Sequence, residues 1–190
     1  MKAVVCRQYG GPEAARLEEA PPPVLLPGMV RVQIRACSAS YASLLVMAGK
    51  HQNRAPLPVT PGTEIAGVVT ELGAGATRFR VGDRVIAGVR AGGYAQEAVA
   101  PEQTVFHLPG DIPFEIGAQF PTVYGTAFAA LKRRANLVSG EVLLVHGAAG
   151  GSGLAALEVG KALGATALLL QRQALGRSST HSLHSAPTTC

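Results

Sequence analysis

The sequence predicts an α/β chain: a strand-rich N-terminal part, followed by the opening of a parallel, doubly wound sheet. Short strand-like segments separated by Gly and Pro turns fill residues 1–110. A continuous apolar segment at 141–146 then runs directly into a glycine-rich turn and a helix-like stretch. The composition, with 47% apolar residues, 15% charged residues, 23 Gly and 13 Pro, is typical of a folded, turn-rich chain.

The strand-rich part shows its clearest signal at residues 30–36. Apolar side chains there alternate with Arg31, Gln33 and Arg35, which predicts a strand with one buried and one wet face. Further strands are expected at 64–72, 84–87, 94–99 and 104–108. Together these segments predict a compact, barrel-like β domain.

Helices are expected at three places before the apolar strand. A short helix at 41–48 has Ser40 as its predicted N-cap and Gly49 as its end. After Pro109 the pattern becomes helical: one helix carries Pro113 and Glu115 in its first turn, and a second runs from 121 to 134. The β domain therefore ends before these helices.

The glycine-rich segment lies between the strand at 141–146 and a helix at 153–163, with another strand at 165–170. This strand-helix-strand order is the opening of a doubly wound sheet. Ala155, Val159 and Ala162 are expected on one side of the helix.

The spacing GxxGxxG gives each glycine of this segment a mechanical use. Gly147 permits the tight turn, Gly150 lets backbone approach a diphosphate, and Gly153 allows close packing of the helix. Exposed amides and the helix dipole favour a phosphate there. A chance glycine cluster is the alternative, and the flanking strand and helix argue against it. The predicted cofactor-binding residues are Gly147, Ala148, Ala149, Gly150, Gly151, Ser152 and Gly153.

Charge and cysteine content exclude several classes of protein. The net charge of +5 depends partly on Arg172 and Arg177, and the other basic residues are scattered along the chain, which argues against nucleic-acid binding. Three cysteines without a CxxC pair predict neither a disulfide framework nor a zinc loop. The start of the chain lacks the pattern of a signal or transit peptide, and no apolar run reaches membrane-spanning length. We expect a cytoplasmic protein, with a mitochondrial location as the alternative.

The order of these segments resembles a known family over residues 1–167. The matching segments are MKAVVCRQYG, VRVQIRACSASYASLLVMAGK, PLPVTPGTEIAGVVTELGAG, VGDRVIA, GGYAQEAV, YGTAFAAL and VLLVHGAAGGSGLAALEVGKALGA. They resemble the zinc-free quinone oxidoreductase (zeta-crystallin-like) branch of the medium-chain dehydrogenase/reductase superfamily. The resemblance implies a GroES-like β-barrel catalytic domain at 1–115 and the start of a Rossmann NADPH-binding domain at 116–170, with NADPH between the two domains. It also implies a small quinone or enone as substrate and a homo-oligomeric parent.

Two positions depart from the zinc-dependent relatives of this family. Where those enzymes have a Cys before the short helix and a His in a GHE motif, this chain has Ser40 and Thr63. Glu64 is then left without co-ligands, so we expect no zinc. Reduction would proceed by hydride transfer from NADPH to an acceptor already polarised by conjugation.

The proton donor has two candidates, because the family's Gly-x-Tyr pattern reads Gly49-Lys50-His51 here. His51 and Tyr41 are these catalytic candidates, and each also has a plain structural interpretation: a solvated loop histidine and a tyrosine packing on the barrel. By resemblance, Tyr124 and Thr126 run beside the cofactor, although a helix interior would suit both equally well.

The resemblance ends at about residue 167, and the polar residues 171–190 follow soon after. We expect this tail to be disordered and the Rossmann domain to be incomplete, in a C-terminally truncated form whose apolar strand faces meet water or a partner. Three hypotheses follow: an NADPH-dependent quinone oxidoreductase by lineage, a catalytically inactive fragment or binding module retaining the barrel, and an RNA-binding protein, which the scattered charge does not favour.

Overall fold

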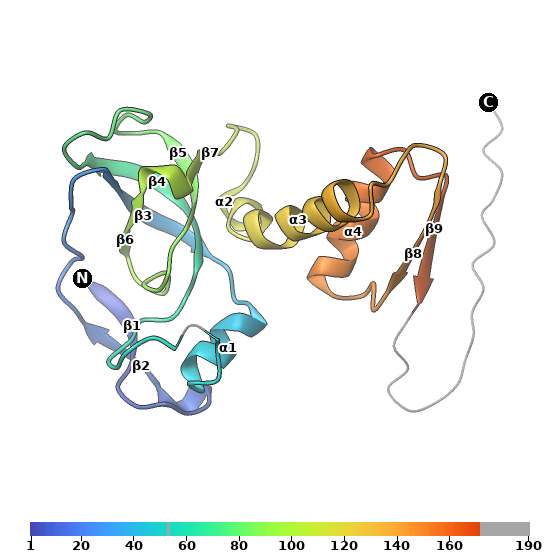
Figure 1. Cartoon of the computed structure of the whole chain (residues 1–190). Coiled ribbons are helices and arrows are strands. Elements are labelled where there is room, and N and C mark those ends of the chain that lie inside the picture. The colour runs from blue at the N-terminus through green and yellow to red at the C-terminus, as the bar shows by residue number, and fades with distance from the viewer. Residues whose placement is uncertain (53, 172–190) are drawn as a thin grey trace. The chain divides into compact units, whose positions relative to one another are not determined.

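The computed structural model describes residues 1–52 and 54–171 and divides the chain into two compact units (Figure 1). The first unit is Met1–Thr126, and the second begins at Ala127. In the described residues no helix is both long and apolar enough to cross a membrane. The predicted domain limits at 115 and 170 stay a prediction.

The first unit is built from antiparallel strands, as the alternating pattern predicts. Strands β1 (Lys2–Cys6) and β2 (Ala15–Glu19) form a two-stranded sheet, with the 3₁₀ turn Pro12–Ala14 between them. A five-stranded sheet has the order β6-β3-β4-β5-β7. Its strands are β3 (Met29–Cys37), β4 (Glu64–Leu72), β5 (Arg84–Gly88), β6 (Glu97–Pro101) and β7 (Val105–His107), with a 3₁₀ turn at Glu102–Thr104.

The strand predicted at 94–99 begins three residues later, at Glu97. The residues before it make hydrogen bonds to the N-terminal strand instead. The amide of Val4 donates to the carbonyl of Tyr94 at 2.8 Å, and Ala3 and Ala95 form a single isolated bridge. One bridge is too short a ladder to count as a strand, and the chain bends at Tyr94 and Gln96 on either side of it.

The largest core cluster of the first unit lies on one face of the large sheet, and a smaller cluster of Ala66, Leu108 and Ala118 packs on the other. Val30 and Val32 of β3 are fully buried, together with Ile65 and Val69 of β4. Gln33 and Arg35 on the opposite face are exposed, which confirms the predicted alternation. Arg31 is half-buried because its guanidinium pairs with carboxylates on the two neighbouring strands.

Helix α1 (Tyr41–Met47) begins and ends where the sequence predicts. The hydroxyl of Ser40 accepts the amide of Ser43 at 3.4 Å, and Gly49 follows with a φ of +66°. Helices α2 (Phe114–Gly117) and α3 (Phe120–Phe128) come after the sheet, and the chain then continues as a π-helix over Ala129–Arg134. The predicted helix at 121–134 is therefore helical throughout, with a change of type near its middle.

The second unit contains the predicted strand-helix-strand order. Strands β8 (Val142–His146) and β9 (Ala167–Gln171) pair in parallel, and α4 (Gly151–Ala162) connects them and packs against them. Val142 and Leu144 are 62% and 50% exposed, as expected for a strand face that no further layer covers. Gln171 still belongs to β9, and the rest of the predicted tail lies outside the described residues.

One prediction about α4 is wrong in part. Ala155 is buried and Val159 is half-buried, but Ala162 is exposed. The helix ends at this residue and Leu163 is its C-cap, so Ala162 lies beyond the part that packs on the sheet.

Candidate functional site: a phosphate-binding turn and a cationic pocket

The glycine-rich turn lies at the junction of β8 and α4, where the sequence places it. Gly147 has a φ of +67°, a backbone conformation that favours glycine, and it makes the tight exit from the strand. The amide of Gly150 donates back to the carbonyl of Gly147 at 3.3 Å and closes the turn. Helix α4 begins at the next residue, Gly151.

Gly153 is required by close packing inside this turn. A Cβ atom at this position would lie 2.6 Å from the Cα of Ala148 and 2.8 Å from the carbonyl oxygen of Gly147. Both contacts are with backbone and cannot be relieved by rotating a side chain. Ala148 itself is buried, so the turn folds back on the first turn of the helix.

The N-terminus of α4 presents backbone amides with no side-chain cap. Gly150 is the N-cap, and the first intrahelical bond runs from the amide of Leu154 to the carbonyl of Gly150 at 2.9 Å. The amides of Gly151, Ser152 and Gly153 precede that bond and have no acceptor within the helix. A Cβ at Gly150 would find no other atom closer than 3.9 Å, so the approach to these amides is open. These residues fit a phosphate group.

The first unit holds a pocket with a volume of about 610 Å³, and it contains two positions that the sequence singles out. Its walls come from the end of α1, the loop after it, and the segments around β4 and β5. The lining residues are Val46, His51, Arg54, Ala55, Pro56, Thr63, Val89, Arg90 and Ala91. His51 and Thr63 are thus brought together, whereas Tyr41 and Ser40 are not among the lining residues.

The other predicted catalytic residue, Tyr41, lies at the first position of α1 and is 74% exposed. It does not pack on the barrel, so its plain structural interpretation is wrong. Tyr124 stacks on Phe120 with ring centroids 4.4 Å apart, and Thr126 is exposed. Both residues lie on α3, in agreement with the helical setting that is the alternative interpretation of the sequence.

Glu64, expected to lack zinc co-ligands, has two hydrogen-bond donors beside its carboxylate. The residue is 6% exposed, and its carboxylate accepts the Ser38 hydroxyl at 3.3 Å and the Thr122 amide at 2.7 Å. Ser40 meanwhile caps α1. Across residues 1–52 and 54–171, no group of three or more His, Cys, Asp or Glu side chains is placed to hold a metal ion.

Cys37 at the end of β3 lies near this carboxylate. Burial raises the pKa of its thiol to about 11; a hydrogen bond from the Glu64 backbone offsets part of this rise, and the negative charge of the Glu64 carboxylate adds to it. The thiol is therefore protonated at neutral pH and is a poor nucleophile.

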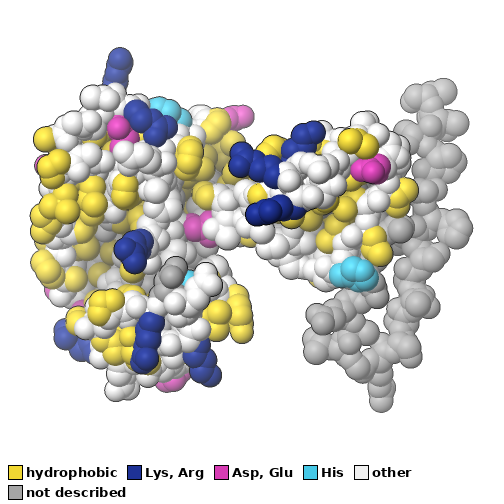
Figure 2. Space-filling model, viewed as in Figure 1, with side chains coloured by type: hydrophobic (Ala, Val, Ile, Leu, Met, Phe, Trp, Pro, Cys, Tyr) yellow, Lys and Arg dark blue, Asp and Glu magenta, His cyan; other side chains and the backbone are white. Residues whose placement is uncertain are grey.

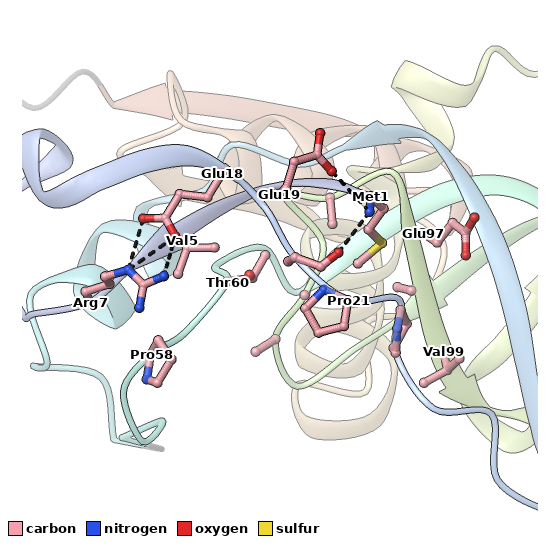
Figure 3. A pocket seen from close by; sticks show the side chains of 16 residues that line it. Met1, Val5, Arg7, Glu18, Glu19, Pro21, Pro58, Thr60, Glu97 and Val99 are labelled. Atoms are coloured by element: carbon pink, nitrogen blue, oxygen red, sulfur yellow. Dashed lines mark hydrogen bonds and ion pairs between the residues drawn. The ribbon is translucent and has the colours of Figure 1, made fainter.

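A second pocket, with a volume of about 360 Å³, lies beside the β1–β2 hairpin (Figure 3). Figure 3 shows four of its charged groups turned toward one another in pairs, with Glu97 apart from them. The Arg7 guanidinium binds Glu18 at 2.6 Å, and the amino group of Met1 pairs with Glu19 at 3.4 Å. Its basic groups are neutralised within the pocket.

Sequence reasoning missed Arg54 and Arg90 in the first pocket. Each is a single basic residue in a loop, a pattern without a signal of its own. Arg54 follows His51 by three residues in the same loop, whereas only the fold brings Arg90 beside them.

Comparison with known proteins agrees with this architecture. The family described as alcohol dehydrogenase GroES-like domain matches residues 26–110. The quinone oxidoreductase of Pongo abelii is 37% identical over 166 residues, which cover 86% of this chain and 50% of that protein. The quinone oxidoreductase-like protein 2 of Rattus norvegicus is 36% identical over 158 residues, covering 83% of this chain and 45% of the relative.

Among solved structures, the quinone oxidoreductase of Thermus thermophilus, also determined in complex with NADPH, superimposes with a TM-score of 0.78 and 34% identity. The match covers 91% of this chain and 54% of that one. The antiparallel sheet of the first unit, the glycine turn and the named relatives together indicate an oxidoreductase lineage. The chain belongs to the medium-chain dehydrogenase/reductase superfamily. Within it, its relatives are quinone oxidoreductases and quinone oxidoreductase-like proteins, and the chain spans about half the length of the curated relatives it matches.

Proposed function

We propose that the chain carries the catalytic half-barrel and the phosphate-binding turn of an NADPH-dependent oxidoreductase that reduces quinones or enones without zinc. The observation that carries this proposal is the turn between β8 and α4. Its uncapped helix N-terminus and the close approach at Gly153 leave backbone amides as the binding groups. The solved NADPH complex of a quinone oxidoreductase relative supports the choice of cofactor.

The residues of the turn would hold the diphosphate of the cofactor through the amides of Gly151, Ser152 and Gly153. When bound, the nicotinamide supplies a pair of electrons as a hydride. Without zinc, the acceptor itself must be polarised by conjugation. Negative charge then develops on an oxygen of the acceptor and needs a hydrogen-bond donor.

His51 is the group in the first pocket that fits this requirement best. An imidazole can donate a hydrogen bond or a proton at neutral pH, and Thr63 in the same pocket offers a second hydroxyl donor. Tyr41 is the weaker candidate because its ring is exposed and does not line the pocket.

A second candidate function is a binding module that retains the barrel but not the reaction. One observation favours it: Val142 and Leu144 of β8 are exposed. RNA binding has less support. In Figure 2, Lys and Arg side chains stand singly over most of the surface and gather in one small group at the π-helix after α3, which carries Lys132, Arg133 and Arg134.

Titration of the purified chain with NADPH, followed by nicotinamide fluorescence, separates the first two functions. Micromolar binding, together with NADPH oxidation that requires a simple quinone and survives a zinc chelator, supports the oxidoreductase. A chain that shows an intact β-sheet by circular dichroism yet neither binds nor oxidises NADPH is the binding module. NADH serves as the control for cofactor preference.

A further inference from the structure

The first pocket combines an apolar interior with only basic charge. Five of its nine lining residues are Val, Ala or Pro on three separate segments, and its titratable side chains are those of His51, Arg54 and Arg90. No lining residue in the described part of the chain is acidic. A ligand that suits such a pocket has an apolar body and a negatively charged end.

The two arginines are not committed to carboxylates elsewhere. In residues 1–52 and 54–171, the ion pairs of the protein join other groups, and neither Arg54 nor Arg90 takes part in one. Arg54 is placed by an aromatic ring instead: its guanidinium lies 4.4 Å from the ring centroid of Tyr9. This contact uses the flat face of the Arg54 guanidinium and leaves the N–H groups at its edge available to an anion.

The pocket of Figure 3 provides the contrast within the same unit. There, Arg7 and the amino group of Met1 each face a carboxylate of β2, and Glu97 adds a third carboxylate, so the lining has no excess of positive charge. The pocket around His51 has two guanidinium groups and no carboxylate in the described part of its lining. This difference in charge favours an anion in the pocket around His51 and not in the pocket of Figure 3.

We propose that the pocket lined by His51, Arg54 and Arg90 binds acceptors that carry an anionic group, with the conjugated body against Val46 and Val89 and the anion at the arginines. That the ligand accepts a hydride rests on the proposed oxidoreductase function, whereas the preference of the pocket for an apolar anion does not. Arg90 and Arg54 are then specificity-determining residues.

The expected size of the preference for an anion follows from the exposure of the two arginines to solvent. Both arginines are exposed, so water and salt screen them, and each contributes about as much as a surface ion pair. Two such contacts correspond to a preference of roughly five- to tenfold for the anion over a neutral compound of the same shape. The preference should shrink as ionic strength rises.

Direct binding of two non-reacting probes tests this proposal without cofactor or turnover. Naphthoate and naphthamide share a ring system and differ in charge, and their dissociation constants are measured by calorimetry on the full chain. Arg90→Gln removes one charge, Arg90→Lys keeps it, and Arg80→Gln is the matched control, since Arg80 is exposed and lies outside the pocket. Thermal unfolding confirms that each variant is folded.

The expected result is tighter binding of naphthoate, a fall of that preference to about two- to threefold in Arg90→Gln, retention in Arg90→Lys, and no change in Arg80→Gln. Equal affinity for the two probes, no binding of either, or a preference that survives Arg54→Gln combined with Arg90→Gln would overturn the proposal. A variant Arg90→Gln that weakens NADPH and leaves naphthoate unchanged also overturns it, because the arginine would then serve the cofactor. If the unaltered chain fails to bind NADPH, these outcomes can still be measured, because the two probes bind without cofactor.

Discussion

The carboxylate of Glu64 accepts the backbone N–H of Thr122 at 2.7 Å and so joins the first residue of β4 to the first turn of α3. An acidic group at this position satisfies an amide that has no acceptor within the helix and faces the positive end of the helix dipole. Its second oxygen accepts the Ser38 hydroxyl at 3.3 Å. In this chain Glu64 therefore connects three segments of the first unit.

Replacing Glu64 tests this structural role. Glu64→Ala leaves the buried Ser38 hydroxyl without its acceptor and opens a cavity, so we expect the free energy of unfolding to fall by about 2–4 kcal/mol. Glu64→Gln keeps an acceptor oxygen and should cost about 1 kcal/mol. Urea unfolding measures both. Glu71→Gln, which removes an exposed carboxylate paired with Arg31, is the control and should cost less than about 1 kcal/mol. Equal losses for Glu64→Ala and the control would contradict the connecting role.

The glycine turn offers a matched pair of variants that separate folding from binding. Gly153→Ala places a methyl group 2.6 Å from the Ala148 Cα, so we expect it to destabilise the second unit by about 1–3 kcal/mol. Gly150→Ala meets nothing closer than 3.9 Å at an ordinary φ of −90°, so its cost should stay within about 1 kcal/mol.

The two variants differ in what they do to the cofactor. The methyl of Gly150→Ala lies on the open approach to the α4 amides, so we expect NADPH to bind at least about tenfold more weakly while thermal unfolding changes little. Gly153→Ala should weaken both. If Gly150→Ala binds NADPH as the unaltered chain does, the turn is not the phosphate site.

The sequence predicts the helices and strands of this fold better than the contacts between distant segments. The alternation at 30–36 and the caps of α1 depend on neighbours in the chain, and the structure confirms both. The later start of β6 depends on pairing with β1, almost a hundred residues away, which no local pattern reports. Likewise, nothing beside Glu64 in the sequence indicates that Ser38 and Thr122 will meet its carboxylate.

The candidate site shows the same division. The glycine turn is local, so spacing alone placed it at the strand-to-helix junction. The pocket at His51 is assembled from three separated segments, and its two arginines have no motif. The exposure of Tyr41 likewise depends on which way α1 faces when it packs through Val46 and Met47 against Cys6 and Val59.

The uncovered face of β8 should make the chain prone to self-association. Val142 and Leu144 alternate with the half-buried Leu143 and Val145, so one apolar row faces solvent. Leu144→Thr keeps the preference for a strand and should lower both the binding of an apolar dye and the light scattering at high concentration. Leu143→Thr is the control on the other row, and we expect it to lower stability by about 1–3 kcal/mol instead. A chain whose dye binding is unchanged by Leu144→Thr would show that this row is not the exposed apolar surface in solution.

Titration of the Cys37 thiol tests whether the surroundings of Glu64 are shielded from water. The folded chain holds the pKa of this thiol at about 11, above its ordinary value of 9.0, because the thiolate would be buried beside a carboxylate. Below pH 9 the thiol is protonated in both folded and unfolded chains and has no effect on the pH dependence of stability. Between pH 9 and 11 the unfolded chain releases this proton and the folded chain keeps it, so the free energy of unfolding falls, and the loss levels off above pH 11. The variant Cys37→Ala should lack this component, and the difference between the two stability curves isolates it.

Alkylation gives an independent reading in a chain carrying Cys6→Ser and Cys190→Ser, where Cys37 is the single thiol. Since the thiolate is the reactive form, the rate of modification by iodoacetamide should rise with a midpoint near pH 11 in the folded chain, and in urea near the ordinary thiol value of 9.0. Adding Glu64→Gln to that chain removes the neighbouring negative charge, while burial, the larger cause, stays in place. The folded midpoint should therefore move down only part of the way. A folded midpoint equal to that in urea would mean that water reaches Cys37 freely and that the Glu64 carboxylate lies in a wetter setting than its hydrogen bonds to Ser38 and Thr122 imply.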